Sequence, residues 1–202
     1  MAAFDFDGTL TRSDSLLPFL RRVAGTRRVV RALLPEVAGL VRLVRGRLDR
    51  DAVKARVIAR TLTGISHDEI SRAGTAYGHA LAERSIRPVL RERIEWHRAR
   101  GHEVVIVSAS LASYLVTVGR ALGVDAVVCT ELEVGGDGRL TGRLLGGNCR
   151  GAEKVARLRR HLDGDDVELW AYGDSRGDDE LLAHADHPTR VGRRDRTVTF
   201  SD

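Results

Sequence analysis

Apolar residues follow two different spacings along this chain, and the change between them falls near Pro88. A short apolar run at residues 2–6 opens the chain and predicts a strand. From there to about Arg84 the apolar residues recur every three or four positions, which predicts amphipathic helices and no further strand. Beyond Pro88, compact β-branched runs alternate with helical stretches. The pattern therefore predicts one strand, a block of helices, and then alternating helices and strands.

Polar residues mark where the helices of the first block begin. Ser13 or Asp14 can cap a first helix, and Asp49 can cap a later one. Ser66 begins a segment with the form of a capping box, which predicts a last helix to about Arg84. Between the first and second of these helices runs an apolar stripe that predicts another helix: Val29, Val30, Leu33, Leu34, Val37, Leu40, Val41 and Val44. This block predicts a small helical bundle.

The second block predicts a sheet with helices on both faces. Pro88 suits a helix start, and Gly101 follows the end of that helix. Strands are expected at 103–107, 126–129 and 167–172, with a weaker one near Thr189 and Val191, helices at 111–122 and 151–162, and a small β-hairpin with arms at 131–134 and 139–144. Strands that alternate with helices predict an α/β fold with a doubly wound, mainly parallel, Rossmann-like sheet, and an all-helical insertion after the first strand.

Composition supports an ordinary globular protein of 202 residues, with 43% hydrophobic and 30% charged residues. Cys129 and Cys149 have no metal-ligand spacing and suit a reducing compartment. Asp5 and Asp7 interrupt the region where a signal peptide would need its apolar core, and no apolar stretch is long enough to span a bilayer. We therefore expect a cytoplasmic protein. Lys54 and Lys154 are the only lysines among 33 basic residues, so each raises the question of whether arginine would fail there.

A net charge of +5 and a pI of about 9.8 would permit binding to nucleic acid or to an anionic membrane surface. Aromatic residues make up only 4% of the chain, so few side chains are available on which exposed bases could stack. We expect a solvated basic face and no nucleic-acid partner.

Polar residues gather where the predicted strands end. Asp5 and Asp7 follow the first strand, Ser108 the second, and Asp174 the last long one, while Lys154 lies in the first turn of the preceding helix. In a doubly wound sheet these strand ends meet at one edge, where ligands bind. Each residue also has a plainer interpretation, since Ser108 or Asp14 can cap a helix, Lys154 can lie at the surface, and Asp178 or Asp179 can favour a helix start.

Together these residues favour phosphoryl transfer from a phosphate monoester. Asp5 and Asp174 offer hard oxygen ligands for Mg²⁺. Asp5 can attack phosphorus to form an aspartyl-phosphate, and Asp7 can protonate the leaving group and then activate water. Ser108 and Lys154 can bind the phosphate oxygens. The substrate would be a small-molecule phosphomonoester.

The motifs Asp5-Phe6-Asp7-Gly8-Thr9-Leu10-Thr11, Val107-Ser108-Ala109-Ser110, Gly151-Ala152-Glu153-Lys154 and Gly173-Asp174-Ser175-Arg176-Gly177-Asp178-Asp179 occur in this order. With them the chain resembles the haloacid dehalogenase superfamily, subfamily IB, and within it the phosphoserine-phosphatase-like branch. The resemblance implies a core formed by residues 1–13 and 87–202 and a helical cap of the C1 type at 14–86. It also implies Mg²⁺ held by Asp5, the Asp7 carbonyl and Asp174 with support from Asp178, and phosphate bound by Ser108, Lys154 and Gly8.

The same resemblance suggests where the rest of the substrate binds. An acidic residue nine positions after the nucleophile recognises the amino group of phosphoserine in that branch, and Asp14 occupies this position. A cap arginine recognises the carboxylate, and Arg56 resembles it. Phosphoserine and other amine-bearing phosphates are therefore candidates among the small phosphomonoesters that could be the substrate.

Three alternatives remain open at this stage. A phosphorelay receiver domain shares the acidic site but would be shorter and would lack the helical insertion. A phosphomutase or phosphotransferase of the same fold would transfer the phosphoryl group to a sugar phosphate. A non-enzymatic module would use the basic segment from Arg21 to Arg60 to bind anionic lipid or nucleic acid.

Overall fold

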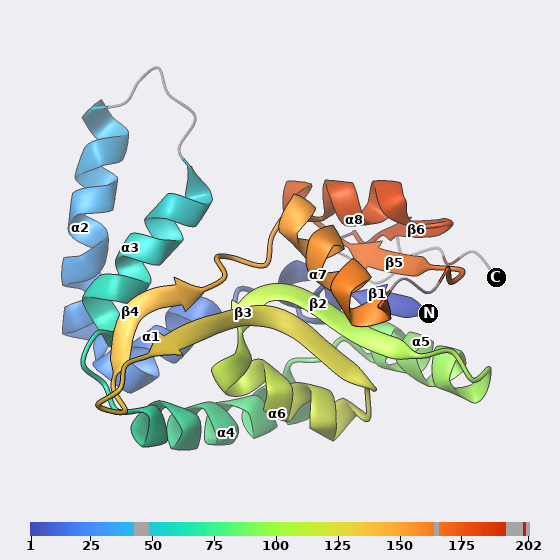
Figure 1. The fold of residues 1–202 in the computed structure, drawn as a ribbon, viewed down its shortest axis with the longest axis horizontal. Helices are drawn as coiled ribbons and strands as arrows, with labels where there is room; N and C mark the ends of the chain where they lie inside the picture. The colour runs from blue at the N-terminus through green and yellow to red at the C-terminus, as the bar shows by residue number, and fades with distance from the viewer. Residues whose placement is uncertain (43–48, 164–165, 193–199, 201–202) are drawn as a thin grey trace.

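A computed structural model describes the chain except for residues 43–48, 164–165, 193–199 and 201–202, and except for the side chains of residues 37–42. Its described residues form a six-stranded sheet in the order β4-β3-β2-β1-β5-β6 (Figure 1). The strands are β1 (Ala2–Phe4), β2 (Val104–Leu111), β3 (Ala126–Val134), β4 (Leu140–Leu145), β5 (Trp170–Gly173) and β6 (His187–Arg190). All neighbours pair in parallel except β3 and β4, so the predicted mainly parallel sheet is confirmed.

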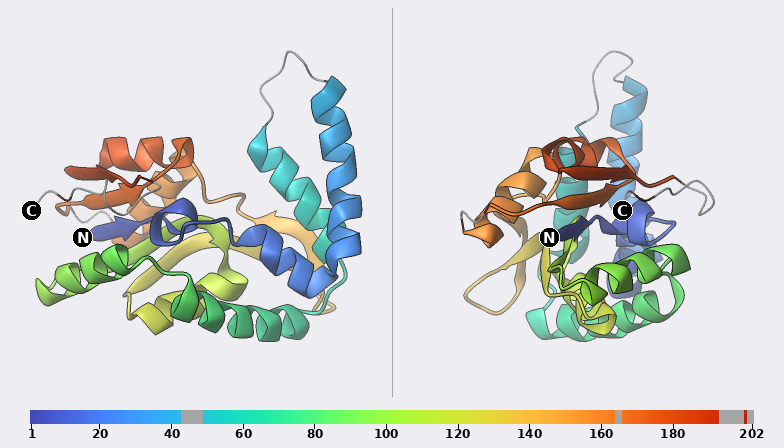
Figure 2. Two further views of the ribbon diagram at one scale, coloured as in Figure 1. Left: turned by 180° about the vertical axis from the view of Figure 1, so that it is seen from behind. Right: turned by 90° about the vertical axis from the view of Figure 1, so that its right-hand side faces the viewer.

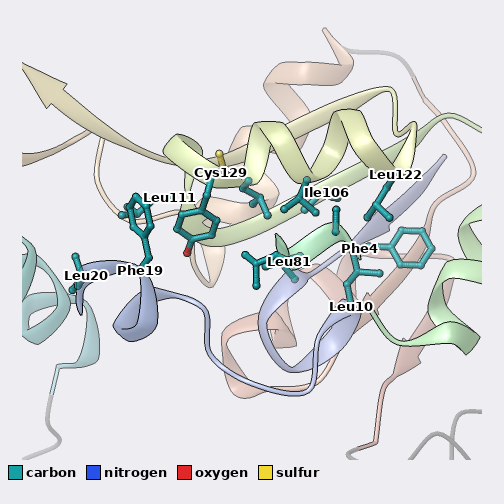
Figure 3. Packing of buried hydrophobic residues seen from close by; sticks show 14 of the residues in the cluster. Phe4, Leu10, Phe19, Leu20, Leu81, Ile106, Leu111, Leu122 and Cys129 are labelled. Carbon is teal, nitrogen blue, oxygen red and sulfur yellow. The ribbon is translucent and has the colours of Figure 1, made fainter. Parts of the chain in front are cut away.

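Helices cover both faces of this sheet. On one face lie α4 (His67–Arg84), α5 (Pro88–Ala99) and α6 (Ala112–Leu122), and on the other lie α7 (Ala152–Leu162) and α8 (Asp179–His184). Because side chains alternate along a strand, Phe4 and Ile106 pack toward the first face, where Leu81 also lies (Figure 3), whereas Ala3 and Val105 pack toward the second. The predicted doubly wound architecture is thus present.

Several strands differ from their predicted bounds. β1 ends at Phe4 instead of residue 6, because the chain turns at Phe6–Leu10, and β4 is shifted by one residue from the predicted arm at 139–144. Residues 126–129 and the first hairpin arm form one continuous strand, β3, which pairs with β2 at its start and with β4 at its end. A polar residue inside an apolar run does not break a strand whose backbone bonds continue on both sides. β2 extends past 103–107 to Leu111 through an irregular register between Ser108 and Leu111. The expected strand at 167–172 is shorter and shifted, as β5.

The helices α1 (Leu16–Ala24), α2 (Thr26–Arg42), α3 (Arg50–Leu62) and α4 follow the turn after β1. Asp49 and Ser66 cap α3 and α4 as predicted, because each side chain accepts backbone N–H groups of the first turn. In α2 the predicted apolar stripe is split: Val29 is buried, but Val30 and Leu34 are exposed, since they lie about a quarter-turn or more away from the buried side. The side chains of Val37, Leu40 and Val41, and the whole of Val44, lie outside the described residues.

The inserted helices do not all stand apart from the sheet. α4 runs alongside α6, while α2 and α3 stand at the end of the molecule far from both termini (Figures 1 and 2). The close approach of α4 and α6 depends on two glycines, because a Cβ at Gly74 would overlap the carbonyl oxygen of Ser113 and one at Gly78 would lie 2.6 Å from that of Tyr114. A division of the chain into core and cap at residues 14 and 86 stays a prediction. Among the described helices, none has the length and apolarity needed to cross a bilayer.

Candidate active site

A cavity of about 290 Å³ opens at the edge of the sheet where β1, β2 and β5 end. Asp5 lies directly after β1, Ser108 lies near the end of β2, and Lys154 lies in the first turn of α7. The cavity is lined by Asp5, Asp7, Asp14, Leu16, Arg50, Asp51, Lys54, Ser108, Ala109, Ser110, Asn148, Arg150, Lys154, Ser175, Gly177 and Asp178. The structure therefore brings together most of the polar residues that the strand-end argument selected.

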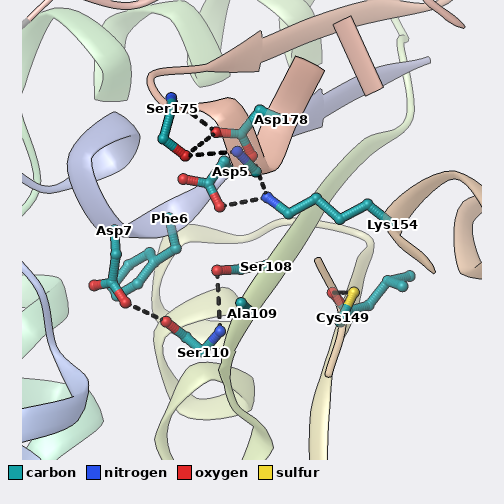
Figure 4. A network of polar contacts seen from close by, with 12 residues as sticks. Asp5, Phe6, Asp7, Ser108, Ala109, Ser110, Cys149, Lys154, Ser175 and Asp178 are labelled. Atoms are coloured by element: carbon teal, nitrogen blue, oxygen red, sulfur yellow. Dashed lines mark hydrogen bonds and ion pairs between the residues drawn. The ribbon is translucent and has the colours of Figure 1, made fainter. Parts of the chain in front are cut away.

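The Lys154 ammonium lies between two buried carboxylates (Figure 4). Its Nζ donates to Asp5 Oδ1 at 2.6 Å and to Asp178 Oδ1 at 2.5 Å. Burial lowers the pKa of Lys154, but the two carboxylates raise it more, so the lysine is held protonated. Burial raises the pKa of Asp5, Lys154 offsets part of that rise, and Asp178 adds to it. One ammonium facing two carboxylates leaves excess negative charge at this end of the cavity.

Asp174 adds a third carboxylate to this charge. One oxygen from each of Asp5, Asp174 and Asp178 lies within 4.8 Å of the others. Burial and the neighbouring Asp5 and Asp178 raise the pKa of Asp174 to about 6, and its Oδ1 is buried with no hydrogen-bond partner. Gly8 makes the approach of Asp174 possible, because a Cβ at Gly8 would overlap the Asp174 carboxylate. The Gly8 backbone also has a φ of +94°, a conformation that favours glycine. An orphaned oxygen within a three-carboxylate cluster fits a hard divalent cation such as Mg²⁺.

Asp7 points away from this acidic cluster, toward Ser110 near the end of β2 (Figure 4). Its Oδ2 accepts from Ser110 Oγ at 2.5 Å and from Ser15 Oγ at 3.0 Å, and its Oδ1 accepts from the Ser15 N–H at 2.9 Å. Burial raises the pKa of Asp7 to about 7 although these hydrogen bonds lower it. A carboxyl group with this pKa is suited to give and take a proton near neutral pH. Its side chain is not part of the acidic cluster, so a metal contact through the Asp7 carbonyl stays a prediction.

The irregular end of β2 shapes the other wall of the cavity. Ser108 is buried, and its Oγ accepts the N–H of Ser110 at 3.2 Å. Its hydroxyl proton is left to donate toward the cavity, as a phosphate-binding serine requires. The same short turn thus carries the predicted phosphate ligand and, through Ser110, the partner of Asp7.

Lys54 is a residue of this cavity that the sequence motifs did not assign. It comes from α3, and its Nζ donates to the Ala109 carbonyl oxygen and, at 2.6 Å, to Asn148 Oδ1. Asn148 Nδ2 in turn donates to Asp51 Oδ1 at 2.7 Å. Burial lowers the pKa of Lys54 to about 8, partly offset by Asp7, Asp51 and Asp14. The signal that could have found it was its being one of two lysines in an arginine-rich chain.

The two residues predicted to recognise the substrate lie in different places. Asp14 lines the cavity, and its Oδ1 also accepts the N–H of Leu17 at 3.1 Å, as a helix cap does. Arg56 does not line the cavity. Its exposed guanidinium pairs with Glu36 at 2.6 Å, on the far side of α3 from Lys54. The cations that α3 brings to the cavity are Lys54 and Arg50, with Asp49 capping the helix from which both project.

A family model for haloacid dehalogenase-like hydrolases matches residues 2–183. The chain belongs to this family. Its resemblance to the haloacid dehalogenase superfamily is therefore confirmed, and the match extends across strands β1 to β5, the cavity and the inserted helices.

Three proteins illustrate what this haloacid dehalogenase-like hydrolase is similar to. The chain is 40% identical to protein CicA of Caulobacter vibrioides over 187 residues, covering 92% of this chain and 83% of CicA. A Bordetella pertussis protein of unknown function aligns with a TM-score of 0.74 at 26% identity, over 93% of this chain and 87% of that one. A substrate-bound phosphoserine phosphatase aligns with a TM-score of 0.60 at 21% identity, over 91% and 81%. The last match shows a shared fold.

Proposed function

We propose that the protein is a Mg²⁺-dependent phosphomonoesterase that acts through an aspartyl-phosphate on a small phosphorylated metabolite. One observation carries this proposal: the Asp5 carboxylate lines the cavity, accepts from the Lys154 ammonium and shares a three-carboxylate cluster with Asp174 and Asp178. A nucleophilic carboxylate must approach an anionic phosphoryl group, and it can do so only if positive charge surrounds the point of attack. Family membership and the fold shared with phosphoserine phosphatase support the same reaction class.

The residues divide the reaction between them. An Asp5 oxygen attacks phosphorus, the bond from phosphorus to the ester oxygen breaks, and Asp7 donates its proton to the departing alkoxide. Asp7 then takes a proton from water, whose oxygen attacks the aspartyl-phosphate and releases inorganic phosphate and free Asp5. Lys154, Ser108 and the Gly8 backbone hold the phosphoryl oxygens throughout.

The metal site would be formed by Asp5, Asp174 and the Asp7 carbonyl, with Asp178 in support. When bound, Mg²⁺ neutralises charge on the phosphoryl group and on the carboxylates around it. Asp178 is held ready for this role, because its Oδ2 accepts from the Ser175 N–H and Oγ, both at 3.0 Å, while its Oδ1 accepts from Lys154.

The remaining cavity wall supports a small substrate with a polar tail. Asp14 offers a carboxylate to an amine, as in phosphoserine or another amine-bearing phosphate, while Arg50 and Lys54 offer positive charge to an anionic group. We propose that residues 14–86 form a cap over a core of residues 1–13 and 87–202, since α3 supplies these cations from outside the sheet. Arg56 does not share this role, because it is turned to Glu36.

The test is phosphate release from a panel that contains p-nitrophenyl phosphate, phosphoserine, phosphoethanolamine and glycerol phosphate, measured with Mg²⁺ and with EDTA. We expect release only with Mg²⁺, none from Asp5→Asn, and retained hydrolysis of p-nitrophenyl phosphate by the matched variant Asp14→Asn. Absence of phosphate release from every ester would overturn the enzyme class. Full activity of Asp5→Asn would overturn the mechanism alone.

A further inference from the structure

α2 carries an exposed stripe in which aliphatic and basic side chains alternate. Arg27, Val30, Arg31 and Leu34 have the i, i+3, i+4, i+7 spacing that places residues on one face of a helix. Val30 is 45% exposed and Leu34 is 60% exposed, and both arginines are exposed as well. α2 stands at the outer end of the molecule, away from the sheet (Figures 1 and 2). Within the described residues nothing covers this stripe, although large aliphatic side chains are normally buried.

A groove beside the stripe is lined by arginines. It has a volume of about 530 Å³, and its wall includes Arg27, Arg28, Arg31 and Arg60. Two of these guanidinium groups are held in place by backbone oxygens: Arg28 donates to the Arg60 and Thr63 carbonyls, each at 3.1 Å, and Arg60 donates to the Ala32 carbonyl at 3.1 Å. Bonds to neutral carbonyls orient the Arg28 guanidinium without cancelling its charge, whereas Arg60 also pairs with Glu36 at 2.6 Å.

The face carries almost no compensating negative charge. The sequence from residue 15 to residue 35 contains five arginines and no acidic residue. The next acid, Glu36, is turned toward α3, where it pairs with Arg56 and Arg60. Arg27 and Arg31 make no ion pair with any residue that the structure describes. Their charge is therefore available to an anionic partner.

We propose that this face of α2, formed by Arg27, Arg28, Val30, Arg31 and Leu34, docks on the surface of an anionic lipid bilayer. Arginines on such a face bind lipid phosphates, and aliphatic side chains between them enter the interfacial layer, as in helices that lie in the membrane plane. Nucleic acid fits less well, because no aromatic side chain on the face offers a stacking surface and the exposed aliphatic groups would stay in water. Docking would hold the protein at a membrane surface through this face of α2.

The test is co-sedimentation of the full chain with vesicles of phosphatidylcholine alone or of phosphatidylcholine mixed with phosphatidylglycerol. We expect binding to the mixed vesicles only, weakened by added salt. Arg27→Gln with Arg31→Gln should weaken it by about tenfold or more, at about 1 kcal/mol for each arginine. Val30→Ser with Leu34→Ser should weaken it as well. The matched control is Val134→Ser with Leu145→Ser, which changes two equally exposed aliphatic residues on the hairpin and should bind like the parent.

Circular dichroism and hydrolysis of p-nitrophenyl phosphate show whether each variant is folded, since none of these residues lines the catalytic cavity. Equal sedimentation with neutral and mixed vesicles, or equal loss in the hairpin control, would overturn the proposal. So would binding to duplex DNA at the same salt concentration with no binding to vesicles. Because co-sedimentation and circular dichroism need no catalysis, the binding result stands apart from the proposed phosphatase activity.

Discussion

Lys54 and Lys154 occupy two crowded sites in which a compact ammonium bonds two oxygens. Lys154 bridges Asp5 and Asp178, and Lys54 bridges the Ala109 carbonyl and Asn148. A guanidinium fork is wider and planar, so it does not substitute for an ammonium between two closely spaced acceptors. The presence of lysine at these two positions of an arginine-rich chain therefore has a structural reason.

Lys54→Met should lower kcat/KM for p-nitrophenyl phosphate by roughly ten- to a hundredfold. The Ala109 carbonyl and Asn148 would lose a donor at a cost of about 1–3 kcal/mol, and the turn that carries Ser108 and Ser110 would be held less firmly. The matched control is Arg56→Met on the same helix, because the exposed Arg56 guanidinium pairs with Glu36 away from the cavity. Steady-state kinetics of the two variants check this. Equal losses of kcat/KM in both would show that Lys54 does not support the active site.

Asp7→Asn should separate the two halves of the reaction according to the leaving group. In a single turnover, phosphorylation of Asp5 by p-nitrophenyl phosphate should persist, because nitrophenolate leaves without a proton. Phosphorylation by an alkyl phosphate should fall by about 10²–10⁴-fold, since alkoxide needs the acid. Rapid-quench measurement of the phosphoenzyme gives both rates. If both substrates lose the same factor, Asp7 does not act as the general acid.

At the scale of elements, contacts between α4 and α6 depend on the absence of side chains. Gly74→Ala should lower the melting temperature although alanine favours helix by about 1 kcal/mol, because the added methyl group would meet the Ser113 carbonyl. Overpacking at such a contact costs about 1–3 kcal/mol. Thr75→Ala, at the exposed neighbouring position, should leave the melting temperature nearly unchanged. A more stable Gly74→Ala variant would show that the helices can move apart freely.

A polar chain links α5 to β5 and predicts that stability depends on pH. Arg93 Nε donates to the Tyr172 hydroxyl at 2.7 Å, and the hydroxyl lies 2.8 Å from His97 Nε2, whose ring contacts His102. Burial lowers the pKa of His97 to about 3 from its ordinary 6.5, with Arg93 and His102 adding to the effect. A neutral His97 can accept the tyrosine proton, whereas a protonated one cannot.

The free energy of unfolding should therefore fall as the pH drops below about 6.5. In the unfolded chain His97 binds a proton near pH 6.5, whereas in the folded protein its pKa is about 3, so acid favours the unfolded state. Urea titrations at pH 7.5 and 5.0 should show this loss, and His97→Asn should reduce its dependence on pH. The matched control His79→Asn changes an exposed histidine of α4 and should keep the parent's slope. An unchanged slope in His97→Asn would assign the pH effect to other groups.

At the scale of the whole molecule, the fold assembles three carboxylates that repel one another. β1 delivers Asp5, and the segment after β5 delivers Asp174 and Asp178, because these strands are neighbours in the sheet. Mg²⁺ should raise the melting temperature of the parent protein by binding the folded state only. Asp174→Asn should lose this rise, and in EDTA it should melt no lower than the parent, because one repelling charge is gone.

Differential scanning calorimetry with Mg²⁺ or EDTA makes this comparison. Asp179→Asn is the matched control, since Asp179 is exposed, follows Asp178 directly, and pairs with Arg190 rather than with the cluster. It should keep the full response to Mg²⁺. If Mg²⁺ still raised the melting temperature of Asp174→Asn, the cation would bind somewhere other than the predicted cluster.

The sequence by itself determined the order of elements, the parallel sheet and the residues at its edge. These follow from local physics: apolar spacing, capping residues, and the convergence of parallel strand ends on one edge. Only the tertiary structure decided that Asp7 turns toward Ser110 and Ser15 and that Lys54, rather than Arg56, reaches the cavity. Both depend on contacts between segments far apart in the chain, which no spacing encodes. The exposure of Val30 and Leu34 was decided in the same way, by which face of α2 met its neighbours.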